Sequence, residues 1–362
     1  MKMEKIIDPI DIKLIKKELT SDKKIGDTNK GGNELYVVTW QDSPNVVKEI
    51  GRIRETTYRM AGASSGLSMD LDRYDTMENP YKQLIVWDPD TEAIIGGYRY
   101  ILGPDIRLKE NHQPDITSSH LYHYSEDFIN EYLPHVMELG RSFVAPEYQS
   151  SKGGAKSLFT LDNLWDGITS VILEHPGIIW FLGKMTIYPS YNPTARNLIL
   201  HFLNKHFHDT DKLATPYNAI EVSDNPSLLD LILRENDLRK DYRLLKDAVR
   251  RLGTQIPPLV NSYINTSSTM KTLGSSINDE LGNAVETGIM ICFNEIYDDK
   301  KSRHVDAFIS NRLKALRNRF PSLAKNTENK LRNRLERNRE KAFIKFTKRK
   351  NISGQSPDIE FR

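Results

Sequence analysis

The chain has 362 residues, of which 38% are hydrophobic and 28% charged, a composition typical of a globular protein with a sizeable core. Its formal net charge is +2, and the single cysteine, Cys292, excludes an intrachain disulfide and fits a reducing compartment. Because the sequence shows no apolar signal region and no run of 18 apolar residues, it predicts a soluble cytoplasmic protein without a transmembrane helix.

The first 71 residues predict a helix, a strand, a second helix and a loop. A short helix is expected over 8–20, and a strand rich in β-branched and aromatic residues over 34–40. Ser43-Pro44 is a typical helix start, and this helix runs to about residue 60. The following segment, 61–71, is a glycine- and serine-rich loop.

The central part of the chain continues to alternate strands and helices. A hairpin over 83–101 turns at Asp88-Pro-Asp-Thr. Apolar residues at helical spacing or in short buried runs predict the elements that follow. These are helices over 120–133, 153–174 and 193–207, and strands over 136–144 and 178–188.

The remainder is more helical and more charged. Two helices are expected over 226–252, another from Pro257, and one last strand over 287–296. The whole order predicts an α/β fold with a mixed central sheet flanked by helices. We expect a core over 1–215, a mostly helical C-terminal extension over 216–311 that packs on the core, and a basic tail over 312–362.

The basic tail carries 15 Lys and Arg against three Glu over 312–350, so the rest of the chain is net acidic. Leucine and phenylalanine residues among these charges indicate a basic amphipathic helix, interrupted at Pro321. Such a helix favours an anionic membrane surface and peripheral attachment there. Nucleic-acid phosphates, and a solvated, partly disordered tail, are the alternatives.

The strand over 136–144 contains Glu138-Leu-Gly-Arg141, and side chains at i and i+3 of a regular strand point to opposite faces. A β-bulge near Gly140 would bring Glu138 and Arg141 into the same cleft and leave backbone N–H groups free to polarise a carbonyl. An exposed ion pair on an edge strand is the alternative.

Further charges surround this strand. Arg99 lies in the middle of a strand, Asp72 and Asp75 end the glycine-rich loop, and Arg54 lies on the second helix. Because buried charges must pair, these residues can form one compensated network that lines a pocket. The alternative is that several of them are simply solvated.

Two connections before helices could bind a ligand. Lys152, Gly153, Gly154 and Lys156 lie where the helix over 153–174 begins, and glycines with free N–H groups at a helix N-terminus suit an anion such as a phosphate. Tyr191 and Asn192 precede the helix over 193–207, where Asn192 is either an N-cap or a ligand contact. The histidines show no metal-ligand spacing, so we expect no metal.

These motifs resemble those of a known group of enzymes. Arg54-x-x-x-Tyr58, Asp72-x-x-Asp75, Gly96-x-x-Arg99 and Glu138-x-x-Arg141 are similar to the pattern of acyl-homoserine-lactone synthases, which are GNAT-fold enzymes. The match is longer to their relatives, the hemolysin-like lyso-ornithine-lipid and glycine-lipid N-acyltransferases. It covers about residues 30–300 and includes Glu138-Leu-Gly-Arg-Ser-Phe-Val-Ala-Pro-Glu-Tyr and Pro257-Pro-Leu-Val-Asn-Ser-Tyr.

The resemblance implies a GNAT-like fold and transfer of a 3-hydroxyacyl group from acyl carrier protein to the amine of an amino acid, glycine first and ornithine next. The acyl-carrier thioester would be a co-substrate, with no tightly bound cofactor and no nucleic acid. The expected roles are general base for Glu138, carboxylate binding for Arg99 and Arg141, and charge balance for Asp75. Substrate contacts are expected from Arg54, Asp72, Phe143, Val144, Tyr191 and Asn192; phosphopantetheine or carrier-protein contacts from Lys152, Gly153, Gly154, Lys156, Lys184 and Arg196.

The sequence departs from the GNAT pattern at two places. One extra residue follows Gln149 in the phosphate loop, and Ile199 stands where the usual tyrosine acid would be. Two other functions stay open: a lactone synthase that also needs S-adenosylmethionine, and a non-catalytic module that binds membrane or nucleic acid.

Overall fold

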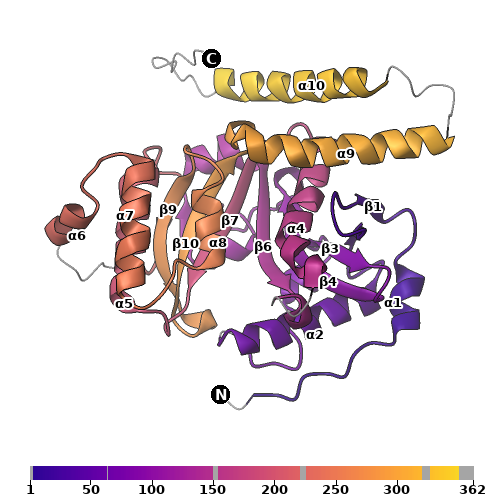
Figure 1. Cartoon of the computed structure of the whole chain (residues 1–362), viewed down its shortest axis with the longest axis horizontal. Helices are drawn as coiled ribbons and strands as arrows, with labels where there is room; N and C mark the ends of the chain where they lie inside the picture. The colour runs from indigo at the N-terminus through magenta and orange to yellow at the C-terminus, as the bar shows by residue number, and fades with distance from the viewer. Residues whose placement is uncertain (1–2, 63, 150–153, 221–225, 320–326, 350–362) are drawn as a thin grey trace.

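The computed structural model describes residues 3–62, 64–149, 154–220, 226–319 and 327–349 (Figure 1). Eight of the described strands form one sheet in the order β1-β2-β3-β4-β6-β7-β10-β9. Neighbours run antiparallel except β6 and β7, which are parallel. The strands are β1 (Lys24–Asp27), β2 (Glu34–Val38), β3 (Lys82–Asp88), β4 (Ala93–Leu102), β6 (Val136–Val144), β7 (Trp180–Ile187), β9 (Lys271–Asn278) and β10 (Ala284–Cys292). A separate pair joins β5 (Tyr122–Tyr124) to β8 (Ala214–Pro216).

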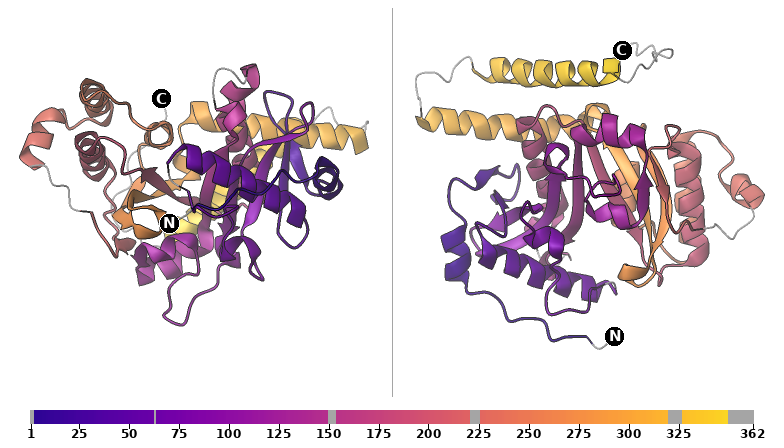
Figure 2. Two further views of the ribbon diagram at one scale, coloured as in Figure 1. Left: turned by 90° about the horizontal axis from the view of Figure 1, so that it is seen from below. Right: turned by 180° about the vertical axis from the view of Figure 1, so that it is seen from behind.

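Helices cover both faces of the sheet (Figures 1 and 2). One face packs against the largest apolar cluster, which takes residues from α4, α5, α7, α8 and α9. The other face packs against α2 and the segment 116–135. The helices are α1 (Ile12–Glu18), α2 (Pro44–Met60), α3 (Arg73–Thr76), α4 (Gly154–Glu174), α5 (Pro193–Phe207), α6 (Pro226–Ile232), α7 (Leu238–Arg251), α8 (Pro258–Ile264), α9 (Asp298–Arg319) and α10 (Thr327–Arg349).

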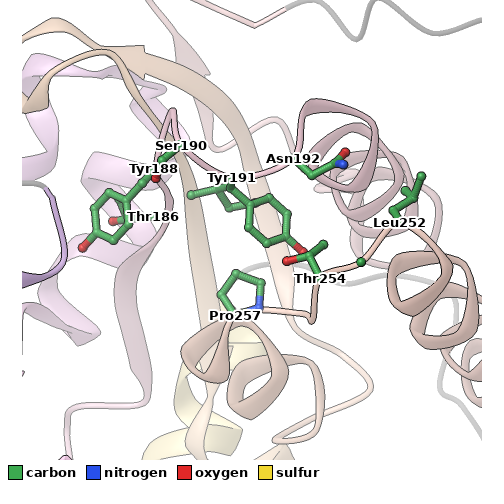
Figure 3. Close-up of a pocket in the computed structure, with 10 residues that line it drawn as sticks. Thr186, Tyr188, Ser190, Tyr191, Asn192, Leu252, Thr254 and Pro257 are labelled. Carbon is green, nitrogen blue, oxygen red and sulfur yellow. The ribbon is translucent and has the colours of Figure 1, made fainter.

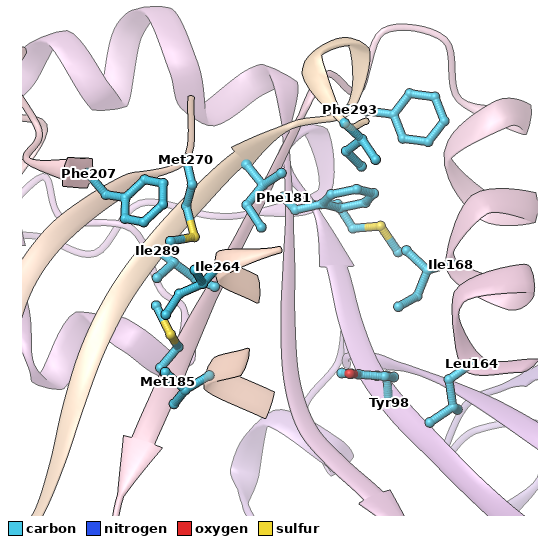
Figure 4. Close-up of a cluster of buried hydrophobic side chains, with 14 of the residues drawn as sticks. Tyr98, Leu164, Ile168, Phe181, Met185, Phe207, Ile264, Met270, Ile289 and Phe293 are labelled. Atoms are coloured by element: carbon cyan, nitrogen blue, oxygen red, sulfur yellow. The ribbon is translucent and has the colours of Figure 1, made fainter. Parts of the chain in front are cut away.

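The first of these faces holds most of the buried apolar surface (Figure 4). Leu164 and Ile168 of α4 lie on one side of this cluster and Met185 of β7 on the other, and all three side chains are buried. Burial of such side chains contributes roughly 1.5–3 kcal/mol each relative to exposure. This packing fixes the two central strands, β6 and β7, from one side.

The parallel pairing of β6 and β7 is short. Only Val136, Met137 and Glu138 pair across to Trp180, Phe181 and Leu182. Beyond these residues β6 pairs only with β4, and β7 only with β10. The two strands therefore separate toward their C-terminal ends, and we call the unpaired region between 139–144 and 183–187 the split.

The predicted fold class, a mixed central sheet flanked by helices, is confirmed. The helix predicted over 120–133 is confirmed only in its second half: β5 occupies 122–124, and the helical residues are 126–132, with a π-helical turn over Phe128–Tyr132. Here tertiary contacts override the apolar spacing, since the hydroxyl of Tyr122 accepts from the Gly288 N–H at 2.7 Å. The predicted last strand begins earlier, at Ala284, and ends at Cys292.

Two strands of the central sheet, β1 and β9, were not predicted from the sequence. β1 has four residues, and β9 is polar and contains Gly274 at φ 87°, so neither shows a strand pattern. β9 and β10 extend the sheet from β7. The central sheet is thus completed by residues from the segment expected as a C-terminal extension.

Candidate active site

The predicted bulge in β6 is confirmed and lies one residue beyond Gly140. Gly97 pairs with Phe143 and Arg99 with Gly140, so Tyr98 of β4 faces two residues, Arg141 and Ser142. Arg141 has φ 48°, a left-handed conformation that is rare for a residue with a side chain. The bulge shifts the alternation of side chains on β6 at the beginning of the split.

Glu138 lies next to the bulge and is enclosed by hydrogen-bond donors. Its side chain is 1% exposed, and its carboxylate accepts from the hydroxyl of Tyr81. It also accepts from the backbone N–H groups of Thr117 and Ser118 at 3.3 and 3.1 Å, and from their hydroxyls at 3.1 and 2.5 Å. In this arrangement both oxygens are occupied, so a proton would reach Glu138 only through one of these groups or a water.

Arg54, Asp72, Asp75 and Arg99, the charged residues named in the sequence, form one network that is buried except at Asp72. Arg99, 3% exposed, donates to both oxygens of Asp72 at 2.8 and 2.7 Å and to Asp75 at 2.9 Å. Arg54, fully buried, donates to Asp75 at 3.2 Å and to Gln83. Burial would raise the pKa of Asp75, but the charges of Arg99 and Arg54 outweigh it and hold this pKa well below its usual range.

The network also has a local cause in the short helix α3. Asp72 accepts from the Tyr74 N–H, and the Asp75 side chain accepts from the Asp72 N–H, which makes a capping box. The cap fixes both carboxylates where they meet Arg99. Asp72 is part-exposed, whereas Asp75 and Arg54 are closed off from solvent.

Arg141 is more exposed than Arg54 and Arg99, with 31% of its side chain accessible to solvent. Its Nε lies 3.1 Å from Asp70 Oδ2, and one terminal nitrogen lies 3.5 Å from Asp72. Neither Arg141 Nε nor Asp70 Oδ2 has an aligned hydrogen-bond partner among the described residues. The hydroxyl of Tyr58 donates to the Ser142 carbonyl at 3.0 Å and so holds the bulge from the α2 side.

The amides at the end of β6 differ in what they face. The Ala145 N–H donates to the Ile95 carbonyl at 3.0 Å. Because bonding groups alternate along an antiparallel ladder, the Phe143 N–H faces β4 and the Val144 N–H faces the split. The Phe143 side chain is buried against α2, so Phe143 contributes packing, whereas Val144 places its N–H at the split.

A second ion pair lies on the β7 side of the split. Lys184 of β7 and Glu286 of β10 are 3.0 Å apart, and Glu286 also accepts from Asn278 at 2.8 Å. Burial would raise the pKa of Glu286, but Lys184 and the hydrogen bonds outweigh it and lower this pKa. Burial and the Glu286 charge raise the pKa of Tyr188, which the positive charge of Arg141 opposes. The charges of Glu286, on the β7 side of the split, and of Arg141, on the β6 side, therefore both act on Tyr188.

A pocket of about 560 Å³ opens beside the C-terminal end of β7 (Figure 3). Tyr191 and Asn192 line it together with Tyr188, and residues 252–254 close it from the end of α7. Asn192 Oδ1 accepts from the Ala195 N–H at 3.0 Å, so it is the N-cap of α5. The hydroxyl of Tyr191 donates to the Gln255 carbonyl at 2.8 Å, which ties the two loops together.

The predicted phosphate-binding segment is described only in part. Lys152 and Gly153 lie outside the described residues, and Gly154 is the first residue of α4. Lys156 lies in the first turn of α4, and its side chain is not among the parts that the structure describes. Lys184 and Arg196, expected to dock a carrier protein, are instead part-buried, with Arg196 donating to the Asn197 side chain at 3.2 and 3.1 Å.

Several residues of the site had no signal in the sequence. Thr117 and Ser118 reach Glu138 from a 3₁₀ turn, and Asp70 lies two residues before the first aspartate of the recognised motif. Only the tertiary fold brings them to β6.

Among the described residues, no group of three or more His, Cys, Asp and Glu side chains is placed to hold a metal ion. No helix in the described ranges is long and apolar enough to cross a membrane.

Comparison with known proteins gives one family and two close relatives. Residues 53–157 match the family model of the acetyltransferase (GNAT) domain. The chain is 49% identical over 315 residues to a glycine N(alpha)-acyltransferase of Phocaeicola vulgatus, which covers 87% of this chain and 97% of the relative. The same identity over the same length relates it to a glycine N(alpha)-acyltransferase of Bacteroides thetaiotaomicron, covering 94% of that relative.

A search of solved structures gives a distant similarity. A CoA-dependent acyl-homoserine lactone synthase, BjaI, with SAM and isopentyl-CoA aligns at 12% identity with a TM-score of 0.34. The alignment covers 76% of this chain and 90% of that one.

Proposed function

The chain belongs to the glycine N-acyltransferase family of GNAT-domain acyltransferases, and from this premise we propose that it transfers a fatty acyl group from acyl carrier protein to the amine of glycine. The product would be an N-acylglycine, a precursor of amino-acid-containing membrane lipids. The observation that carries the proposal is the split, where a bulged strand, the Val144 amide and an arginine meet.

The amide of Val144 at the split suits the electrophile. A thioester carbonyl placed against β6 could accept from this N–H, which then stabilises the negative charge that develops on the oxygen when the amine attacks. The new carbon–nitrogen bond forms as the thiolate of the carrier arm leaves, and the amine loses one proton. The Tyr58 bond to the Ser142 carbonyl keeps the bulge, and with it the amide, in a fixed place.

The acceptor's charges suit Arg141 and its carboxylate neighbours. Arg141 keeps 31% of its side chain exposed, so its terminal nitrogens can bind the acceptor carboxylate by charge-assisted hydrogen bonds while its buried Nε stays beside Asp70. Arg99 has both terminal nitrogens engaged by aspartates and would support Asp72 rather than the substrate. Glu138 remains the predicted general base, acting through Thr117, Ser118, Tyr81 or a water.

The carrier protein would dock near the pocket beside β7. Four exposed cations of α7, at spacings of three and four residues, share one face of that helix, which ends at the pocket. They are Arg239, Arg243, Lys246 and Arg250. We propose this face, in place of the part-buried Lys184 and Arg196, for the acidic carrier protein. Raising the salt concentration should then weaken productive docking.

The reaction is tested by incubating the full chain with 3-hydroxyacyl carrier protein and a panel of amino acids, followed by mass analysis of the products. A linear N-acylglycine supports the proposal, and N-acylornithine would change the acceptor. A lactone formed only with S-adenosylmethionine would favour a lactone synthase. Turnover with acyl-CoA but not with the acyl carrier protein would remove the proposed donor.

The docking face has its own test. Replacing the four α7 cations with glutamine should raise KM for the acyl carrier protein and leave KM for the amino acid unchanged. If KM for the carrier protein does not change, the donor does not dock at α7.

A further inference from the structure

The last described helix, α10, lies at the outer edge of the molecule and is held there by specific contacts (Figures 1 and 2). Arg339, 6% exposed, donates to the carbonyls of Ile172 and Ile178 at 3.1 and 3.2 Å and lies over the Phe293 ring at 4.2 Å. Phe346 is buried beside Trp180, with ring centroids 6.0 Å apart. One face of α10 is therefore fixed on the protein.

The opposite face of α10 is rich in cations. Six basic side chains on this helix are exposed, at spacings of 4, 3, 4, 4 and 3 residues. At about 100° per residue they fall within an arc of about 80°, turned away from the docked face, and they extend over about 27 Å of helix. We call this set the basic stripe: Lys330, Arg334, Arg337, Lys341, Lys345 and Lys348.

The basic stripe lies at the closed end of the central strands. Trp180, which contacts Phe346, is the first residue of β7 and pairs with Val136 of β6, whereas the split begins after Glu138. From Trp180 to Ile187 the strand rises by about 23 Å, so the pocket is far from α10. A carrier protein on the basic stripe would present its thioester to the closed side of the sheet. The stripe therefore fits a partner other than the donor.

We propose that the basic stripe docks the protein on an anionic lipid surface. Cations in one narrow arc along a straight helix can all reach one flat layer of headgroups at the same time. Ile344, 42% exposed and adjacent to Lys345, adds an apolar side chain that a lipid surface can accept and that phosphates alone cannot. The docked face of α10 stays behind this plane.

The proposal is tested with the full chain and sedimenting vesicles. Phosphatidylcholine vesicles are compared with vesicles in which about a third of the lipid is phosphatidylglycerol. The variant replaces Lys330, Lys341, Lys345 and Lys348 with glutamine. Because each basic residue near an anionic surface contributes roughly a fivefold factor, the variant's partition into anionic vesicles should fall about 10²–10³-fold. Neither protein should bind neutral vesicles.

The matched control removes the same number of cations elsewhere, by replacing the four α7 cations with glutamine. This control should keep its binding to anionic vesicles, since α7 lies apart from the basic stripe. The α10 variant should keep the parental turnover with soluble substrates, so failure of the docking proposal and failure of the proposed reaction are distinguishable.

Three results would overturn the proposal. Equal vesicle binding by parent and α10 variant removes the stripe as the contact. Binding to a DNA duplex that depends on the stripe, without binding to anionic vesicles, assigns it to nucleic acid. A raised KM for the acyl carrier protein in the α10 variant, with vesicle binding unchanged, assigns it to the donor.

Discussion

Replacing Glu138 with glutamine should cost stability, because the site around this carboxylate supplies donors. If the glutamine NH₂ takes the position of Oε1, it faces the Ser118 N–H, and this backbone donor cannot rotate to find another acceptor. In the Oε2 position it would displace the hydroxyl of Tyr81 from its acceptor. Either placement leaves at least one buried donor unsatisfied, and the bonds that remain lose their charge assistance. We expect a loss of about 2–4 kcal/mol in the free energy of unfolding.

Urea unfolding at neutral pH measures this loss, with Glu110→Gln as the matched control. Glu110 is exposed, so its replacement should change the free energy of unfolding by less than about 0.5 kcal/mol. Turnover must be corrected for the folded fraction. If Glu138→Gln is as stable as the parent while corrected turnover falls about 10²–10⁴-fold, the structural reasoning is refuted and the predicted general base is supported. Near-normal corrected turnover would remove Glu138 from that role.

Three further predictions concern the buried parts of the fold. Asp75→Asn should lower the free energy of unfolding by about 3–5 kcal/mol, because it leaves Arg54 and Arg99 without their shared carboxylate; calorimetry measures it. Folding lowers the pKa of Asp75, so this carboxylate stabilises the parent fully above its unfolded pKa of about 4, and the stabilisation is lost as the pH falls further. The Asp75→Asn variant lacks this contribution and should therefore lose less stability in acid than the parent. Burial raises the pKa of the Cys292 thiol to about 12, so a thiolate-directed reagent should label it only at the rate of unfolding; fast labelling of the folded protein would contradict this. Gly103→Ala should destabilise by about 1–3 kcal/mol or more, since an added Cβ would lie 1.8 Å from a backbone oxygen; an unchanged melting temperature would show that the backbone relaxes.

The sequence predicted the parts of the site that depend on local pattern. The order of strands and helices indicated a mixed sheet, and a glycine inside the strand over 136–144 indicated a bulge, which the pairing of β4 and β6 confirms. Asn192 before Pro193 indicated an N-cap, and it caps α5. Each of these features is set within a few neighbouring residues, so the chain shows it directly.

The sequence by itself thus determined the family, the fold class and the set of charged residues on β4, β6 and α3. Only the tertiary structure decided which of them are accessible. In the folded protein, Glu138 is buried and hydrogen-bonded to Thr117 and Ser118. Arg54 is buried and paired with Asp75, whereas Arg141 is part-exposed at the split. Exposure depends on residues far apart in the chain, because side chains that cover a strand come from other elements, and no local spacing records which of them will do so.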